Sequence, residues 1–118
     1  MSASPRFLAN GDTVMVVEFG ETIDLETSGH VTALTTRINS LALKGITDLV
    51  PTFRSLAIHY DPRYLAFDTL KATVRTALPD LDGDHHSKRE WLIPTCYDPQ
   101  ISPDLTEVAE RCSLSIEE

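Results

Sequence analysis

The chain of 118 residues has few of the residues that mark several common functional classes. It contains two cysteines, Cys96 and Cys112, whose spacing matches no zinc or redox motif. We therefore expect two packed thiols and not a disulfide. Basic residues are also scarce, ten against eighteen acidic ones, which gives a net charge of −8. Because phosphates require a basic face, this balance argues against a nucleic-acid-binding protein.

Long apolar runs are absent as well. None approaches the roughly 20 residues that span a bilayer, and the first six residues lack the apolar stretch of a signal peptide. We therefore expect a cytoplasmic protein that does not enter a membrane. The sequence also has no Gly-x-x-x-x-Gly-Lys and no Gly-x-Gly motif, so no phosphate-binding loop is expected.

Apolar residues make up 42% of the chain, enough for the core of one domain. Asn10-Gly11 between two apolar runs predicts a hairpin, because both residues tolerate a positive φ. Patterns of β-branched and alternating residues predict strands over 6–9, 13–19, 46–50, 55–60 and 90–93.

Three segments have the features of helices. Asp24 begins a helix that we expect to continue to Lys44 and to stop at Gly45, with an apolar stripe of Val31, Leu34, Ile38 and Leu41. A second helix is expected over 67–78, with a weak start at Ala66 because alanine offers no capping hydroxyl. Ser102-Pro103-Asp104 has the residue order of a helix start and predicts a third helix, with Leu105, Val108, Ala109 and Cys112 on its apolar side.

This order of elements predicts an α+β fold. The middle part is the split βαββαβ pattern of ferredoxin-like folds, an antiparallel sheet with both helices on one face. An extra N-terminal strand precedes it and a C-terminal helix follows it. We expect a ferredoxin-like domain over 6–98, and over 99–118 a helix and the start of a linker. The sheet face opposite the helices must be covered by another element or serve as a binding surface.

Three places in the chain have residues that can carry chemistry. His59 and Asp61 flank Tyr60 and fall on one side of a strand, as a general base and its partner would, although a local strand-end bond explains them more simply. Asp84-His85-His86 resembles a metal site but lacks further ligands, so we expect a solvated loop and no metal. Arg54 can bind a carboxylate or phosphate, or pair with an acid of this chain, and we favour the pair.

The last four residues, Ser115-Ile116-Glu117-Glu118, leave two interpretations open. A serine followed three residues later by a glutamate has the form of a capping box, which would begin a further helix. The alternative is a frayed acidic tail.

Several segments in order resemble the start of the allophanate hydrolase subunit 1 family, which includes KipI and the B subunit of 5-oxoprolinase. The similar segments are RFLANGDTVMVVEFG, VPTFRSLAIHYDP and IPTCYDPQISPDLTEVAERCSLSIEE. The resemblance implies that this chain is the N-terminal part of a longer protein, followed by a helix and a cyclophilin-like β domain. Two departures are Ala66, in place of a capping hydroxyl, and the absence of a glycine pair after Tyr97.

The resemblance also implies partners. Members pair with an allophanate hydrolase subunit 2-like protein, which is similar to the C subunit of 5-oxoprolinase, and with a third protein they open 5-oxoproline to glutamate in an ATP-dependent reaction. We therefore expect an assembly domain that holds no cofactor itself, with Arg54, His59 and Asp61 as candidate binding residues. The alternative is a KipI-like inhibitor that binds a sensor histidine kinase.

Overall fold

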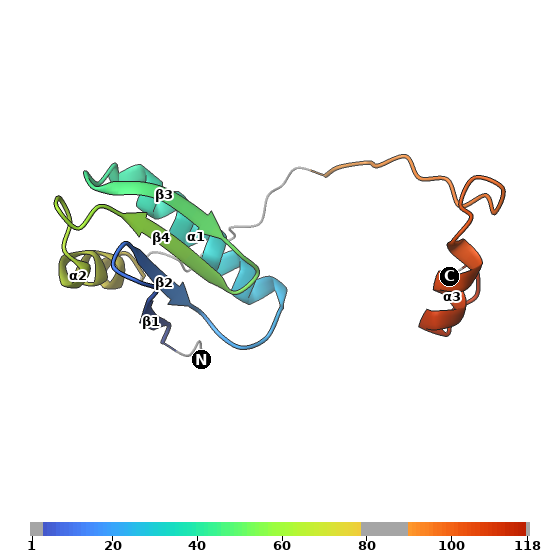
Figure 1. Cartoon of the computed structure of the whole chain (residues 1–118), viewed down its shortest axis with the longest axis horizontal. Coiled ribbons are helices and arrows are strands. Elements are labelled where there is room, and N and C mark those ends of the chain that lie inside the picture. Colours follow the sequence, from blue (N-terminus) through green and yellow to red (C-terminus); the bar gives the residue numbers. More distant parts are fainter. Residues whose placement is uncertain (1–3, 79–89, 118) are drawn as a thin grey trace. The chain divides into compact units, whose positions relative to one another are not determined.

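The computed structural model describes residues 4–78 and 90–117, which belong to two compact units, 1–86 and 87–118. The described part of the first unit contains strands β1 (Arg6–Ala9), β2 (Val14–Glu18), β3 (Ile46–Pro51) and β4 (Ser55–Tyr60), with helices α1 (Leu25–Leu41) and α2 (Phe67–Ala77). The described part of the second contains α3 (Leu105–Cys112). Figure 1 labels these elements.

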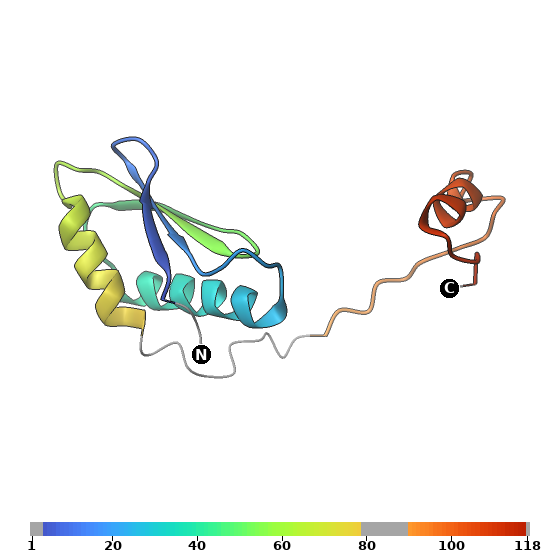
Figure 2. The same cartoon turned by 90° about the horizontal axis from the view of Figure 1, so that it is seen from below.

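The four described strands form one antiparallel sheet in the order β1-β2-β4-β3. Figure 2 shows α1 and α2 on the same side of this sheet. The expected α+β class, the antiparallel sheet and the placement of both helices on one face are therefore confirmed.

One expected strand is wrong. Residues 90–93 form no strand, and Trp91, Leu92 and Ile93 are all exposed. In the split βαββαβ pattern the last strand lies beside the first strand of the pattern, which is β2 here. That position is already occupied by β1. Because a tight hairpin joins β1 to β2, the entropy cost of closing the loop between them is small.

The hairpin between β1 and β2 forms as the sequence predicts. Gly11 adopts a φ of +65°, and the Asn10 N–H donates to the Val14 carbonyl at 2.9 Å. At the N-terminus of α1 the Asp24 carboxylate accepts a hydrogen bond of 2.8 Å from the Thr27 N–H, as an N-cap residue does.

The ends of the helices differ in detail from the expectation. Helix α1 stops at Leu41, not at Lys44, because Ala42 adopts a left-handed conformation with φ of +46°. Helix α2 starts without a side-chain cap at Ala66, as expected. Helix α3 starts at Leu105, since the Ser102 hydroxyl donates to the Cys96 carbonyl and does not cap the helix.

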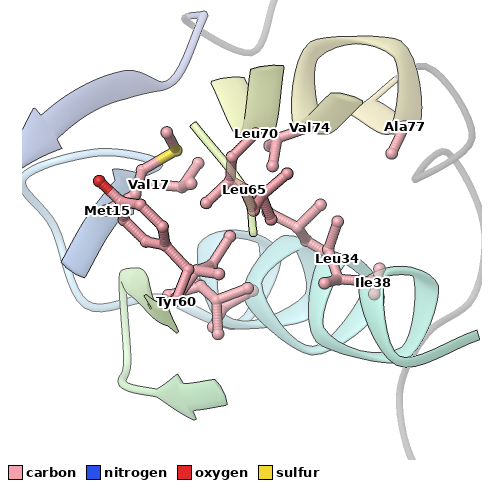
Figure 3. Packing of buried hydrophobic residues seen from close by; sticks show 13 residues of the cluster. Met15, Val17, Leu34, Ile38, Tyr60, Leu65, Leu70, Val74 and Ala77 are labelled. Carbon is pink, nitrogen blue, oxygen red and sulfur yellow. The ribbon is translucent and has the colours of Figure 1, made fainter. Parts of the chain in front are cut away.

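The core lies between the sheet and the two helices of the first unit (Figure 3). Alternate residues of the central strands contribute Met15 and Val17 from β2 and Leu56, Ile58 and Tyr60 from β4. The expected helix stripes supply most of the rest of this core: Val31, Leu34, Ile38, Leu70, Val74 and Ala77. Leu41, expected in the stripe of α1, is 36% exposed and lies outside this core.

The second unit has a different character. The apolar residues of α3 line a shallow groove of about 240 Å³ together with Tyr97, Leu114 and Ile116, and no residue of α3 is buried. Cys96 and Cys112 are both exposed free thiols, so the expectation of packed cysteines is wrong.

Candidate functional site

The candidate functional site is the sheet face that points away from α1 and α2. Because side chains alternate along a strand, the burial of Leu56, Ile58 and Tyr60 directs Ser55, Ala57 and His59 to the opposite side. The described helices of this unit pack only on the face that carries Leu56, Ile58 and Tyr60 (Figure 2). We call the second side the open face.

One row across the open face is entirely apolar. The strand register aligns a residue from each strand, in the order Leu8, Val16, Ala57 and Val50. The two outer members, Leu8 and Val50, are each 41% exposed. We call these four residues the apolar row.

A polar row borders the apolar row on one side. It contains Arg6 and Glu18, which form an ion pair, and Ser55 and Thr52, whose hydroxyls are 2.9 Å apart. The hydrogen bond from Arg6 lowers the pKa of the Glu18 carboxyl. The row places fixed charge beside exposed apolar surface.

Arg54 lies in the turn between β3 and β4, next to this polar row. Its guanidinium Nη1 donates to the Gly20 carbonyl at 3.1 Å and lies 3.9 Å from the Glu18 carboxylate. The sequence favoured a pair between Arg54 and an acid of the chain, and Glu18 is that acid. The side chain remains 43% exposed and can still meet a partner.

His59 lies on the other side of the apolar row. It is half-buried on the open face, between Val14 of β2 and Asp48 of β3. Asp61 follows the end of β4, and Arg63 donates to its carboxylate from both the backbone and the guanidinium. These bonds lower the pKa of the Asp61 carboxyl, and they hold it as an acceptor for Arg63.

The three predicted binding residues therefore do not gather at one end of the hairpin. Arg54 precedes β4, while His59 and Asp61 lie toward its far end. Arg54 and His59 are five positions apart along extended chain, which is about 17 Å at the usual rise. Arg54 and His59 instead border the apolar row from opposite sides, the arrangement of an apolar centre and a polar rim found in protein–protein interfaces.

Sequence reasoning missed two members of the polar row, Arg6 and Glu18. Glu18-Phe19-Gly20 ends RFLANGDTVMVVEFG, one of the segments that carry the family resemblance. The structure gives it a tertiary role, because Glu18 and Gly20 both contact Arg54, and Phe19 stacks on His30 with ring centroids 5.8 Å apart. The proximity of this segment to Arg54 depends on the pairing of β2 with β4, which no local sequence pattern reveals.

Neither a cluster of metal ligands nor a membrane-spanning helix occurs in the residues that the structure describes. No group of three or more metal-binding side chains occurs in the described ranges, and the Asp84-His85-His86 candidate lies outside them. No helix in the described residues has the length and apolarity needed to cross a membrane. The open face, with its apolar row and polar rim, has the features of a binding surface.

The sequence model of the carboxyltransferase domain, subdomain C and D, matches residues 5–118. The chain belongs to this family. The match confirms the resemblance drawn from the sequence segments, and a relative in Bacillus subtilis (strain 168), the B subunit of 5-oxoprolinase, supports it at 33% identity over 119 residues. That alignment covers 92% of this chain and 50% of the relative, so the chain spans about half the length of the curated relative that it matches.

Solved structures share the fold of this chain. The N-terminal domain of the histidine kinase inhibitor KipI from Bacillus subtilis is 26% identical, with a TM-score of 0.57, and the alignment covers 75% of this chain and all of that domain. The urea carboxylase of Kluyveromyces lactis shares the fold with a TM-score of 0.64 at 21% identity, covering 68% of this chain and 7% of the enzyme.

Proposed function

We propose that this chain is the N-terminal assembly domain of a subunit of a 5-oxoprolinase-like hydrolase complex. The relative named as the B subunit of 5-oxoprolinase supports a role within a complex of several subunits. In this proposal an allophanate hydrolase subunit 2-like protein is the partner, ATP is consumed by the whole complex, and this domain holds no cofactor.

The observation that carries the assembly role is the apolar row on the open face. Leu8 and Val50 expose apolar surface at its ends, and ionised or polar side chains border it. Desolvation of the apolar centre would provide affinity, while Arg54 and the Arg6–Glu18 pair at the rim would fix the orientation of the partner. In a longer protein, this surface could also help to position the domain that would follow this one.

Co-purification of the full-length protein with the subunit 2-like partner tests the proposal. Val50→Asp introduces a charge into the apolar row and should abolish assembly, while Arg54→Ala should weaken it by only a few-fold. Ile23→Asp is the matched control, because Ile23 is also exposed, at 71%, but lies outside the sheet. If Val50→Asp assembles as well as the control, the open face is not the interface.

A KipI-like inhibitor is the second candidate function. Its support is the alignment with the whole N-terminal domain of the kinase inhibitor KipI. The two functions predict different partners for the same full-length protein. Capture of a histidine kinase from the same organism, together with a loss of its autophosphorylation, would favour the inhibitor, and stable assembly with the subunit 2-like protein would favour the hydrolase complex.

A further inference from the structure

The two edges of the sheet differ in how well they are protected against an added strand. The outer edge at β3 contains Pro51, which lacks an N–H, and an irregular register between Ile46 and Asp48. A proline, an irregularity and a charged residue are the features by which proteins block an exposed edge. The edge at β1 has a regular register over its four residues and contains no proline. Its one charged residue, Arg6, is paired with Glu18 of β2.

The register of the β1–β2 hairpin shows which backbone groups of β1 face outward. The Asn10 N–H bonds to Val14, and hydrogen-bonded pairs recur at every second residue of an antiparallel ladder. Leu8 and Arg6 are therefore bonded to β2, while the N–H and C=O groups of Phe7 and Ala9 point away from it. Within the described residues these four groups have no hydrogen-bond partner.

Two cations lie beside this edge on the helix side of the sheet. The Lys71 ammonium is 5.7 Å and the Arg75 guanidinium 5.4 Å from the centroid of the Phe7 ring. The two residues are one helical turn apart, and like charges at this spacing repel each other. Neither forms an ion pair with a carboxylate in the described part of the chain, although the protein has a net charge of −8.

We propose that the β1 edge binds an extended acidic segment of a partner protein as an additional strand. The backbone of this segment would bond to Phe7 and Ala9, as in other complexes formed by strand addition. Carboxylates on its helix side would meet Lys71 and Arg75, and apolar side chains on its other side would extend the apolar row beyond Leu8. A second copy of this chain is a poorer occupant, because edge-to-edge pairing would bring two sets of these cations together.

This surface adjoins the one used in the proposed function at Leu8, but its backbone bonds would be made by Phe7 and Ala9 at the outer edge of β1. Val50→Asp alters the open face at the opposite edge of the sheet and leaves β1 unchanged. Failure of either proposal therefore leaves the other intact.

Peptide titration of the ¹⁵N-labelled chain of residues 1–118 tests the inference. The probe is a capped octapeptide of alternating glutamate and valine, and its control has lysine in place of glutamate. The acidic peptide should shift the amide signals of Phe7 and Ala9, and the basic peptide should bind more weakly. Ala9→Pro removes an outward N–H without removing a bond to β2 and should weaken binding of the acidic peptide.

A charge reversal separates specific recognition from general attraction. Lys71→Glu should weaken the acidic peptide about fivefold. Lys44→Glu is the control, since Lys44 also lies over an aromatic ring, that of Tyr64, but away from the edge. Core methyl signals report whether each variant is folded.

Four results would overturn the inference. They are equal binding of both peptides, no shift at Phe7 and Ala9, equal effects of the two lysine variants, and no binding of either peptide. A concentration-dependent dimer that Ala9→Pro abolishes, detected by sedimentation, would also overturn it, because the edge would then serve a second copy.

Discussion

The guanidinium of Arg54 donates a hydrogen bond of 3.1 Å to the carbonyl of Gly20, which lies 34 residues earlier in the chain. A second bond runs in the other direction, from the Phe19 N–H to the Arg54 carbonyl at 2.9 Å. The two bonds join the loop after β2 to the turn between β3 and β4. Two of the sequence segments that carry the family resemblance therefore meet at one end of the sheet.

Removal of the Arg54 side chain, which leaves the backbone bond from Phe19 in place, should have a moderate effect on stability. We expect Arg54→Ala to lower the free energy of unfolding by about 0.5–1.5 kcal/mol, the usual contribution of a partly exposed hydrogen bond. Urea denaturation measures it. Arg111→Ala, which removes an exposed pair with Glu107 in the second unit, should leave this transition unchanged. Equal effects of the two variants would show that the side-chain bond from Arg54 to Gly20 contributes nothing.

Burial should decide the cost of truncating leucines in α1. Leu34 is fully buried, and Leu34→Ala should cost about 2–5 kcal/mol through lost burial and the cavity that remains. Leu41→Ala makes the same change in the same helix at a residue that is 36% exposed, and should cost less than about 1 kcal/mol. Chemical denaturation of both variants checks the order, and similar losses would contradict the placement of the core.

Gly45 should tolerate substitution worse than Gly11. A Cβ on Gly45 would lie 2.9 Å from the Leu65 Cβ and 3.2 Å from the Tyr64 Cβ, at a φ of +105°. A Cβ on Gly11 meets nothing within 4 Å, so Gly11→Ala should cost only the roughly 1–2 kcal/mol of a left-handed backbone. Thermal melts of the two alanine variants should show the larger loss for Gly45→Ala. Equal melting temperatures would contradict this packing.

Acid should destabilise the first unit through its bonded carboxylates. The Thr27 N–H, and then the Thr22 hydroxyl, lower the pKa of Asp24, and the pKa values of Glu18 and Asp61 are lowered by Arg6 and Arg63. A folded pKa below the unfolded value of about 4 gives stability that is present above that value and is lost as the pH falls through the folded pKa. The free energy of unfolding should therefore decrease below about pH 4.

A substitution at Asp24 tests the source of this pH dependence. Asp24→Ser keeps an oxygen that can accept the Thr27 N–H but removes the titrating group. Its unfolding free energy, measured with urea between neutral pH and about pH 3, should decrease less steeply than that of the unsubstituted protein. An unchanged slope would show that Asp24 does not contribute.

The isolated chain should have no catalytic turnover. The described residues contain no assembled nucleophile and base, and the Asp61 carboxylate is already bonded to Arg63. An assay of purified residues 1–118 for 5-oxoproline-dependent product should read at background. Activity that survives repurification and is lost in His59→Ala would contradict this expectation.

The elements with a strong local pattern could be predicted from the sequence. The Asn10-Gly11 hairpin, the alternation from Ser55 to Tyr60 and the stripe around Leu34 each depend on residues that are close in the chain. Residues 90–93 have a similar local pattern but form no strand. Two segments could pair with the free edge of β2, and the structure shows that β1, its hairpin partner, does so. The local sequence pattern of either segment does not indicate this choice.

The candidate site was less predictable for the same reason. Arg54 and His59 were selected by residue type, and their separation along β4 follows once the strand is known. The polar row around Glu18 depends on the pairings of β2 with β1 and β4, which bring Arg6 and Arg54 to one carboxylate. Such a meeting of three segments becomes visible only when the sheet order is known.

The early position of every described strand has a consequence for how the protein is made. All four strands precede residue 61, so the sheet can pair while later residues are still being synthesised. Its helix side nevertheless needs Leu70, Val74 and Ala77 of α2 to complete the core. Folding of the first unit during translation can therefore finish once α2 has left the ribosome, before α3 has emerged.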